Sequence, residues 1–447
     1  MKFTDTIVAS ATAPGRGAIS IIRISGLDSF TIGNKLSHKT LLPRHASFGS
    51  FFSQSTSLDT GIWVYFPSPH SFTGEDVVEF QGHGNPILIQ AILSAVIDAG
   101  ARLAEPGEFS KRAFINDKID LTQAEAINDL INASSINAAK AAHQSLDGLF
   151  GKKVNVIVDQ LISVRTHLEA HIDFPDEDIS PAHIRTIASS ITNISAKVKH
   201  LLLSASEGVK LNRRYSVVLL GQPNAGKSSL LNALGKAPLA IVTDIAGTTR
   251  DLLKFNLVLN GFELSITDTA GIRLTDNIIE TEGINRARQQ VDSADLILCL
   301  FDGKTDQITT QDITFLLGQK THQKLAIIRT KIDLYHHSIH NQTDFELLNI
   351  SSTTGLGLDE LVSWISTKLG GTLVTETQFS ARQRHITQLK KANDTIDIAA
   401  NYIPAQENID LIAEDLRLTQ KALSEITGEF SSDDLLTSIF SSFCIGK

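Results

Sequence analysis

The chain is organised around the sequence GQPNAGKS, residues 221–228. The apolar run 216–220 before it predicts a buried strand, and the run SLLNAL at 229–234 predicts the first turns of a helix. This strand–loop–helix context is the one that the phosphate-binding pattern G-x-x-x-x-G-K-[ST] requires. The sequence therefore predicts a nucleotide site at the centre of an α/β domain.

Each conserved residue type of the loop pattern has a physical task. Gly221 and Gly226 permit turns that point backbone N–H groups at phosphate oxygens, and the helix start adds its own N–H groups. We expect Lys227 to reach the β- and γ-phosphates and Ser228 to bring a hydroxyl to Mg²⁺.

Composition is that of an ordinary globular protein. The chain has 447 residues, of which 42% are hydrophobic and 20% charged, and this length predicts about two to four domains. No apolar run approaches the ~18 residues of a membrane span, and the N-terminus lacks signal-peptide character. Two cysteines, Cys299 and Cys444, leave no disulfide framework in view, which favours a reducing cytoplasm. The net charge of −9 argues against indiscriminate nucleic-acid binding but not against a local RNA-binding patch.

The first ~118 residues predict a mixed α/β unit by their alternation and turns. We expect strands at 18–26, 61–66 and 76–80 and a helix at 86–99. By residue type alone, four polar residues near strand ends would be solvated or locally ion-paired: they are Arg23, Glu79, His83 and Lys118.

Helical periodicity dominates two separate stretches on either side of an α/β stretch. Apolar residues recur at helical spacing over 121–168 and 182–211, with an acidic break at 173–178, and again from 378 onward. Between them, strands and helices alternate as in a parallel, doubly wound sheet. The expected strands are 216–220, 262–267, 295–301, 325–329 and 347–350, with helices near 283–291 and 359–369. We interpret this as an α/β domain inserted into a helical domain, with boundaries 1–118, 119–211, 212–377 and 378–447.

Four further motifs follow the phosphate loop in the order used by guanine-nucleotide switches. GTTRD at 247–251 offers Thr249 to Mg²⁺, and DTAG at 268–271 offers Asp268 to Mg²⁺ through water and the Gly271 N–H to the γ-phosphate. TKID at 330–333 places a carboxylate, Asp333, where two guanine N–H groups can donate to it, a pair that adenine lacks. The stem of Lys331 can lie against the base, and Ser351-Ser352 can close over it. Together these motifs predict a GTP site.

Hydrolysis requires help that the switch segment does not supply. Ile272 follows Gly271, and an apolar side chain cannot orient the attacking water. Asn224 and the backbone of the segment 243–246 can together hold a monovalent cation beside the phosphates, where it would stabilise developing charge. By residue type alone, Asn224 is equally well explained as a residue that shapes the loop.

The chain resembles a known family in stretches spread along its whole length. The matching stretches are PGRG at 14–17, RISG at 23–26, SFTGED at 71–76, PGEF at 106–109, RAF at 112–114, DLTQAEAI at 120–127, DFP at 173–175, the phosphate loop 221–229, the segment 245–251 and the end 423–447. They resemble, essentially end to end, the bacterial tRNA-modification GTPases called MnmE or TrmE.

The resemblance implies an N-terminal folate-binding domain that dimerises, a central helical domain and an inserted potassium-dependent GTPase domain. It implies a cytoplasmic homodimer that works with the FAD-containing partner MnmG. The two proteins would place an aminomethyl or carboxymethylaminomethyl group on carbon 5 of the wobble uridine of certain tRNAs. The one-carbon donor would be 5-formyl- or methylene-tetrahydrofolate.

The resemblance also implies roles for individual residues. It assigns folate binding to Arg23, Glu79, Lys118 and Lys447, and so replaces the interpretation of the first three as solvated residues. It assigns K⁺ to Asn224, Thr243, Ile245 and Thr248, and Mg²⁺ to Ser228 and Thr249. It implies that Glu280 orients the hydrolytic water, and it gives Cys444 a function whose chemistry is open. The whole predicted nucleotide site comprises Asn224, Ala225, Gly226, Lys227, Ser228, Ser229, Thr243, Asp244, Ile245, Ala246, Gly247, Thr248, Thr249, Asp268, Thr269, Ala270, Gly271, Thr330, Lys331, Asp333, Ser351, Ser352 and Thr353.

Two departures from the family pattern carry expectations of their own. Thr330 stands where the family usually has Asn, so we expect a looser tie between the base site and the phosphate loop, worth roughly 1 kcal/mol. Asn85 stands where Gly is common, which leaves the conformation of the loop at 81–85 open.

Two other functions compete with tRNA modification. One is a regulatory GTPase switch of the ribosome-assembly kind, which needs no folate pocket in the first 118 residues. The other is a folate-dependent one-carbon transferase with a silent nucleotide domain. A lipid anchor on Cys444 is disfavoured, because Gly446 and a terminal Lys447 fit a prenylation box poorly.

Overall fold

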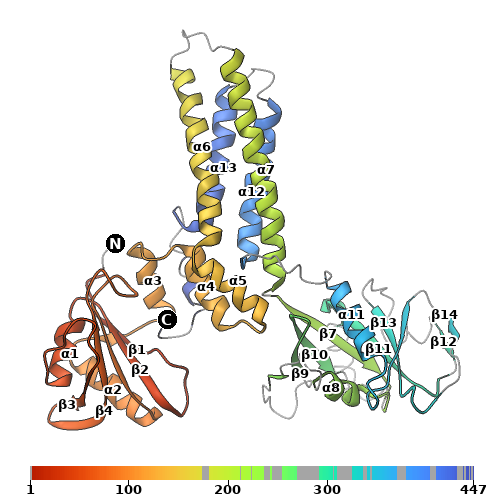
Figure 1. Cartoon of the computed structure of the whole chain (residues 1–447), viewed down its shortest axis with the longest axis horizontal. Helices are drawn as coiled ribbons and strands as arrows, with labels where there is room; N and C mark the ends of the chain where they lie inside the picture. Colours follow the sequence, from red (N-terminus) through yellow and green to blue (C-terminus); the bar gives the residue numbers. More distant parts are fainter. Residues whose placement is uncertain are drawn as a thin grey trace, which may run out of the picture. The chain divides into compact units, whose positions relative to one another are not determined.

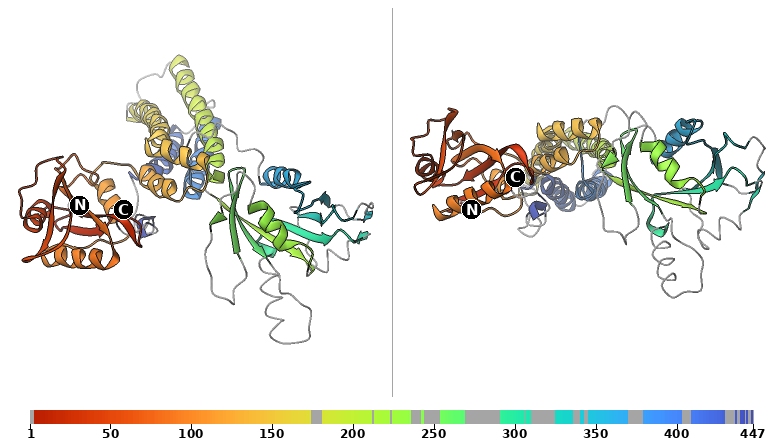
Figure 2. Two further views of the ribbon diagram at one scale, coloured as in Figure 1. Left: turned by 60° about the horizontal axis from the view of Figure 1, so that its bottom comes forward. Right: turned by 90° about the horizontal axis from the view of Figure 1, so that it is seen from below.

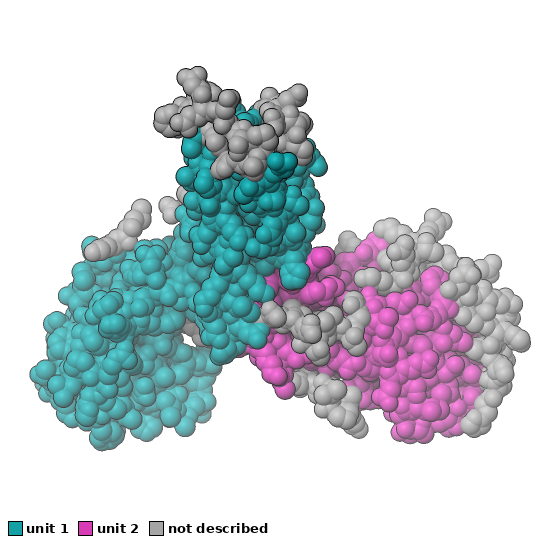
Figure 3. Space-filling model, turned by 45° about the horizontal axis from the view of Figure 1, so that its top comes forward, with its two compact units in different colours: residues 1–128, 143–202, 384–447 teal, residues 129–142, 203–383 magenta. Residues whose placement is uncertain are grey.

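The structure is a computed structural model whose contacts divide it into two compact units, coloured separately in Figure 3. The first unit comprises residues 1–128, 143–202 and 384–447, and the second comprises 129–142 and 203–383. The residues that the structure describes are 3–173, 181–211, 213–222, 224–235, 242–243, 254–268, 291–305, 307–309, 325–335, 340–342, 345–369, 379–402, 409–429, 436, 439–441, 443 and 446. The four predicted domain boundaries stay predictions.

The first unit begins with a six-stranded sheet of order β3-β4-β5-β2-β1-β6. Neighbouring strands are antiparallel, except that β6 runs parallel to β1. The strands are β1 (Ile7–Ser10), β2 (Gly17–Ser25), β3 (Ser47–Ser53), β4 (Thr56–Phe66), β5 (Val77–Gly84) and β6 (Arg102–Leu103). Helices α1 (Ser29–Ser37) and α2 (Pro86–Asp98) pack against this sheet (Figure 1).

Alternation along β2 separates the hydrophobic core from the functional face. Ile22 and Ile24 are fully buried in the core with α1 and α2 residues, so Arg23 between them faces the other side of the sheet. Part of that other side is covered by α3 (Glu108–Ile115), whose Phe109 is buried against Ile7. Arg23 therefore lies on the face of the sheet that α3 covers only in part.

Helix α2 explains the conformation at Asn85, the position where the family commonly has Gly. Asn85 is the residue before the helix, and its side chain accepts a hydrogen bond from the backbone N–H of Ile87 at 2.9 Å. Asn is a favoured residue at this capping position. The loop at 81–85 therefore ends in a regular helix cap.

Four long helices form the predicted helical domain, and Figures 1 and 2 show them side by side. They are α6 (Leu149–Asp173), α7 (Pro181–Leu211), α12 (Gln383–Tyr402) and α13 (Ile409–Thr427), preceded by α4 (Leu121–Ile131) and α5 (Ile136–Leu146). Their apolar residues recur every three or four positions and are buried, as in the run Val154, Ile157, Leu161, Val164 and Leu168.

Polar side chains join the long helices in pairs. Arg165 of α6 donates to Gln420 of α13 at 2.6 Å, and Ser195 of α7 donates to Asp397 of α12 at 2.7 Å. Through these contacts, helices from the two separate helical stretches of sequence pack side by side in one bundle.

The second unit contains a seven-stranded sheet of order β15-β13-β11-β7-β10-β9-β8. Its strands are β7 (Arg214–Gly221), β8 (Val242–Thr243), β9 (Lys254–Leu259), β10 (Phe262–Asp268), β11 (Leu296–Asp302), β13 (Leu325–Thr330) and β15 (Glu346–Asn349), and a separate pair joins β12 (Gln307–Thr309) to β14 (His340–Gln342). Buried apolar residues lie on both faces of the sheet, and α8 (Lys227–Gly235) and α11 (Leu358–Lys368) pack on one of them.

All five strands predicted from the sequence of this domain are present, within two residues of their expected ends. The expectation of a parallel sheet is wrong at one edge. β9 runs antiparallel to β10, and β8 runs antiparallel to β9, because the turn at Asn260 and Gly261 returns the chain directly. Most of the helix expected at 283–291 lies outside the described residues.

Candidate nucleotide and folate sites

The phosphate loop runs from the end of β7 to the start of α8, as the motif predicts. Gly221 has φ 152°, and a Cβ there would come within 2.6 Å of the Leu300 carbonyl oxygen. Gly226 has φ 90° and Asn224 has φ 64°, backbone conformations that residues with a Cβ rarely adopt. Asn is one of the few residues that tolerate this left-handed region, so the backbone supports a loop-shaping role for Asn224.

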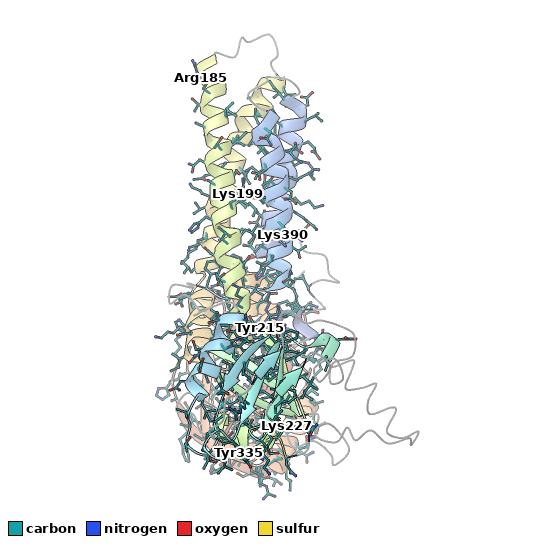
Figure 4. The ribbon with its side chains drawn as sticks, turned by 90° about the vertical axis from the view of Figure 1, so that its right-hand side faces the viewer. Arg185, Lys199, Tyr215, Lys227, Tyr335 and Lys390 are labelled. Carbon is teal, nitrogen blue, oxygen red and sulfur yellow. The ribbon has the colours of Figure 1, made fainter. Side chains whose placement is uncertain are left out.

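Lys227 lies across its own loop. Its ammonium donates to the carbonyl oxygens of Gly221 at 2.6 Å and Gln222 at 3.1 Å, and the residue is 7% exposed (labelled in Figure 4). From this position the ammonium can exchange backbone carbonyls for phosphate oxygens without a change of helix or strand. The neighbouring Ser228 and Ser229 are exposed at the helix start, where a hydroxyl is accessible to a metal ion.

Thr330 ties the base site to the phosphate loop. Its hydroxyl lies 2.8 Å from the carbonyl oxygen of Ala225 and is completely buried from solvent with it. The shorter side chain therefore still supplies a direct hydrogen bond to the phosphate loop, while the expectation that this connection is looser than with Asn stays a prediction. The Thr330 side chain reaches the Ala225 carbonyl because Gly226, directly after Ala225, lets the phosphate loop lie close to Thr330. A Cβ on Gly226 would lie 3.4 Å from the Thr330 side chain.

A second connection was missed from the sequence. Lys331, at φ 57°, donates to the Asn224 carbonyl oxygen at 2.8 Å and to the carboxylate of Asp302 at 2.6 Å. Burial alone would raise the pKa of the Asp302 carboxyl, but hydrogen bonds and the charge of Lys331 hold that pKa below its usual value. Asp302 ends β11, the neighbour of β13, so an acidic residue at that strand end was the available signal.

The guanine-reading residues follow at the same edge of the sheet. Asp333 is half-buried in the turn after Lys331, and the Ile332 N–H donates to the Ile350 carbonyl at 3.4 Å. Ser351 is fully buried and its hydroxyl accepts from the Thr354 N–H, which fixes the loop containing Ser352 and Thr353. The structure thus brings the phosphate loop and both base loops together.

Several predicted residues cannot be placed. Thr243 lies in β8 and Asp268 ends β10, but their side chains are outside the description. The rest lie outside the described residues altogether: Asp244, Ile245, Ala246, Gly247, Thr248, Thr249, Thr269, Ala270, Gly271, Glu280, Cys444 and Lys447. The potassium and Mg²⁺ ligand sets therefore stay predictions.

In the first unit, Arg23 and Glu79 form one site across neighbouring strands. The two residues are paired in the β2–β5 register, and Arg23 Nε donates to Glu79 Oε1 at 2.8 Å. The guanidinium lies 5.5 Å from the centre of the Phe72 ring and 5.7 Å from that of Phe109. No described residue accepts a hydrogen bond from the two terminal NH₂ groups of Arg23, so its fork can bind a ligand's oxygen atoms.

Lys118 lies against the loop that carries Phe72. Gly74 has φ 78°, and a Cβ there would meet the Lys118 stem at 3.1 Å, so glycine leaves room for the lysine. The lysine itself is exposed. Arg23 and Lys118 therefore both lie against the segment 71–76, one of the stretches that carry the family resemblance, and Glu79 is bonded to Arg23.

A network of buried charged side chains holds the segment 71–76 in place. Arg112 is fully buried and bonds the carboxylates of Asp5, Glu75 and Glu108 at 2.8–3.1 Å. Although burial opposes ionisation, Arg102 and Arg112 together hold the pKa of Glu108 below its usual value. Because Glu75 belongs to the segment 71–76, this network fixes the loop beside Arg23.

The C-terminal end of the chain packs on α4 and on the sheet that carries Arg23. Phe440 and Phe443 are buried with Leu121 and Ala124. A Cβ on Gly446 would come within 2.0 Å of the Ser10 carbonyl oxygen, which places the tail directly on the end of β1. Strand β1 is the neighbour of the strand that carries Arg23.

Two family descriptions and full-length relatives match this chain. The family description "GTP-binding protein TrmE N-terminus" matches residues 6–118, and "MnmE helical domain" matches residues 121–444. A "tRNA modification GTPase MnmE" from Francisella philomiragia is 45% identical over 453 residues that cover all of both chains. The chain belongs to the MnmE family. A relative of the same name from Hydrogenovibrio crunogenus is 46% identical and covers 99% of each chain.

Membership of the MnmE family agrees with the observed parts: a TrmE-type α/β domain, a helical domain and a G domain with a phosphate loop. The G domain of the FeoB iron transporter of T. maritima is 24% identical, covers 35% of this chain, and has a TM-score of 0.26, too low to support an argument. No helix within the described ranges is both long and apolar enough to span a membrane.

Proposed function

We propose that this MnmE-family chain is a potassium-dependent GTPase of bacterial tRNA modification. With the FAD-containing partner MnmG, it adds an aminomethyl or carboxymethylaminomethyl group to carbon 5 of the wobble uridine of certain tRNAs. A 5-formyl- or methylene-tetrahydrofolate supplies the one-carbon unit. The protein acts in the cytoplasm as a homodimer.

A single observation carries the proposal: one chain combines a formed GTP cradle with a second polar site on a different domain. The cradle consists of the phosphate loop, Thr330, Lys331 and Asp333. The second site consists of Arg23, Glu79 and Lys118. A regulatory switch has no use for the second site, and a one-carbon transferase has no use for the first.

The residues of the G domain suit GTP, Mg²⁺ and K⁺. Lys227 would hold the β- and γ-phosphates, and the exposed hydroxyl of Ser228 suits Mg²⁺ together with Thr249. The exposed side chain of Asn224 offers an amide oxygen in the loop, which suits K⁺ together with Thr243, Ile245 and Thr248. K⁺ in such a position stabilises charge on the phosphate oxygens. Glu280 would orient the water, a task that Ile272 cannot perform.

The residues of the N-terminal domain suit a reduced folate. The fork of Arg23, which has no hydrogen-bond partner among the described residues, and the ammonium of Lys118 match the carboxylate and carbonyl oxygens of such a molecule. Glu79 matches its N–H donors. Lys447 would complete this set, and Cys444 would act near it.

Three measurements test the proposal together. Nucleoside mass spectrometry of tRNA from cells lacking the protein should show loss of the substituted wobble uridine, restored by the wild-type gene. The purified protein should hydrolyse GTP faster in potassium than in sodium and bind 5-formyltetrahydrofolate. Unchanged tRNA without folate binding would favour the regulatory switch, and folate binding without GTP turnover would favour the silent transferase.

A further inference from the structure

An aromatic side chain stands exposed at the edge of the Arg23–Glu79 site. Phe72 is 38% exposed, although its ring contacts the guanidinium of a residue that is itself largely covered. Phe109, whose ring lies 5.7 Å from the same guanidinium, is completely buried. Of the two rings beside Arg23, only that of Phe72 is exposed, so only Phe72 can contact a ligand.

The residues on both sides of Phe72 in the chain are held in place by hydrogen bonds. Thr73 is fully buried, where its hydroxyl lies 2.7 Å from that of Ser25 and its carbonyl accepts from Asn116 at 2.8 Å. On the other side of Phe72, the Ser71 hydroxyl donates to the carbonyl of Glu75. These bonds hold the backbone on both sides of Phe72 and so fix the loop that carries its ring beside Arg23.

The groups around Phe72 define the kind of ligand ring. Arg23 contacts both the Phe72 ring and the carboxylate of Glu79, so the ring and the carboxylate border the same side chain. Only Oε1 of Glu79 is bonded to Arg23. Oε2 has no partner among the described residues, so it can accept from an N–H-rich ring edge. A flat heterocycle with N–H donors along one edge satisfies both the carboxylate and the exposed ring face.

We propose that Phe72 is the stacking platform for the pteridine ring of the folate, with the N–H edge of that ring directed to Glu79. This inference rests on the proposed folate function and adds a residue and a ligand part to it. Of the two rings in a folate, the pteridine carries several ring and amino N–H groups along one edge, whereas the p-aminobenzoyl ring carries no such edge. The offset face-to-face contact that results is a favoured geometry for flat rings.

The test compares Phe72→Leu with two matched variants in the full-length protein. Phe72→Leu keeps an apolar side chain and removes the ring, whereas Phe72→Tyr keeps the ring. Phe48→Leu makes the same change at a 71% exposed phenylalanine of β3 and serves as the control. Calorimetric titration with 5-formyltetrahydrofolate should show about tenfold weaker binding for Phe72→Leu. The other two variants should bind as the wild type does.

A second ligand separates the ring parts. The fragment p-aminobenzoyl-glutamate lacks the pteridine, so the ratio of its affinities for wild type and Phe72→Leu should stay near one. Equal weakening of both ligands would overturn the inference, because it would mean that Phe72 acts only by ordering Arg23. Wild-type affinity of Phe72→Leu for the whole folate would also overturn it, while leaving the proposed function intact. Failure of the wild-type protein itself to bind the folate would remove both.

Discussion

Asn224 has two explanations that a suitably chosen substitution separates. Its φ of 64° suits a loop-shaping residue, and its exposed amide suits a potassium ligand. Alanine would remove the amide and also strain the backbone, whereas glycine removes the amide alone. We therefore expect Asn224→Gly to abolish the stimulation of GTP hydrolysis by potassium over sodium while nucleotide affinity stays within a few fold. Steady-state turnover in matched potassium and sodium buffers measures it, and retained stimulation would leave Asn224 a loop-shaping residue only.

Thr330 supports a prediction about nucleotide affinity. Thr330→Val keeps the shape of the side chain but leaves the Ala225 carbonyl without its hydroxyl partner at 2.8 Å. Loss of one buried hydrogen bond costs about 1 kcal/mol, so the affinity for GTP and GDP should fall about fivefold. Thr330→Ser, which keeps the hydroxyl, is the control. Fluorescent-nucleotide titration of the three proteins decides, and equal affinities would show that the Thr330–Ala225 bond does not hold the loop.

A buried cluster of charged side chains joins three helices of the first unit. Glu125 of α4 is 2% exposed and bonds Arg384 of α12 through both carboxylate oxygens at 2.7 Å, with His385 Nε2 at 2.9 Å. Arg384 also donates to the carbonyls of Glu425 and Ile426 near the end of α13. This cluster connects the helix after the N-terminal domain with the two helices that follow the G domain in sequence.

Neutralising Glu125 should destabilise this arrangement. Removing one partner of a buried ion pair costs about 3–5 kcal/mol, so Glu125→Gln should lower the melting temperature followed by helical circular dichroism at 222 nm. The control is Glu414→Gln, which removes an exposed pair with Arg417 on α13 and should melt like the wild type. Identical melting of all three proteins would show that the buried cluster does not stabilise the bundle.

The same cluster has a defined pH dependence. Burial opposes ionisation of Glu125, but the charges of His385 and Arg384 outweigh it and hold the pKa of Glu125 well below its usual range. A lowered carboxyl pKa contributes stability that is present above the ordinary value, about 4.3, and is lost as the pH falls through the folded-state pKa. The difference in melting temperature between wild type and Glu125→Gln should therefore narrow as the pH is lowered below about 4.

Elements with strong local periodicity could be predicted, and elements formed by distant pairing could not. The apolar repeat in α6 and the strand–loop–helix at 216–234 are signals within one stretch of chain, and both were confirmed. β1 is four residues long and pairs with β2 and β6, so its identity depends on partners far away in sequence. The same limit applies to side chains. The role of Asp302 requires that β11 lie beside β13, and the loop that carries Phe72 is bonded at Thr73 to Asn116, 43 residues away in sequence.

For the whole chain, both ends of the inserted α/β segment are anchored on one helix within the second unit. Leu211, the last residue of α7, is buried with Ala138 and Ala141 of α5. Ser380, after the insertion, donates its backbone N–H to the Ala141 carbonyl at 3.2 Å. A Cβ on Gly208 would also lie 2.6 Å from the Phe379 carbonyl oxygen. The chain therefore leaves and re-enters the helical part at one point, the arrangement that tolerates an inserted domain.

We expect a variant in which a short Gly-Ser linker replaces residues 212–378 to fold as a helical, monodisperse protein without GTP binding. Closing so short a gap costs little loop entropy, and the contacts of Leu211 and Ser380 with α5 are retained. Lys227→Ala in the full-length chain is the control, because it should lose nucleotide binding with the G domain present. Size-exclusion chromatography and circular dichroism report folding, and titration with 5-formyltetrahydrofolate reports the N-terminal site. An aggregated linker variant beside a well-folded Lys227→Ala protein would mean that the G domain stabilises the helical bundle and is not simply inserted into it.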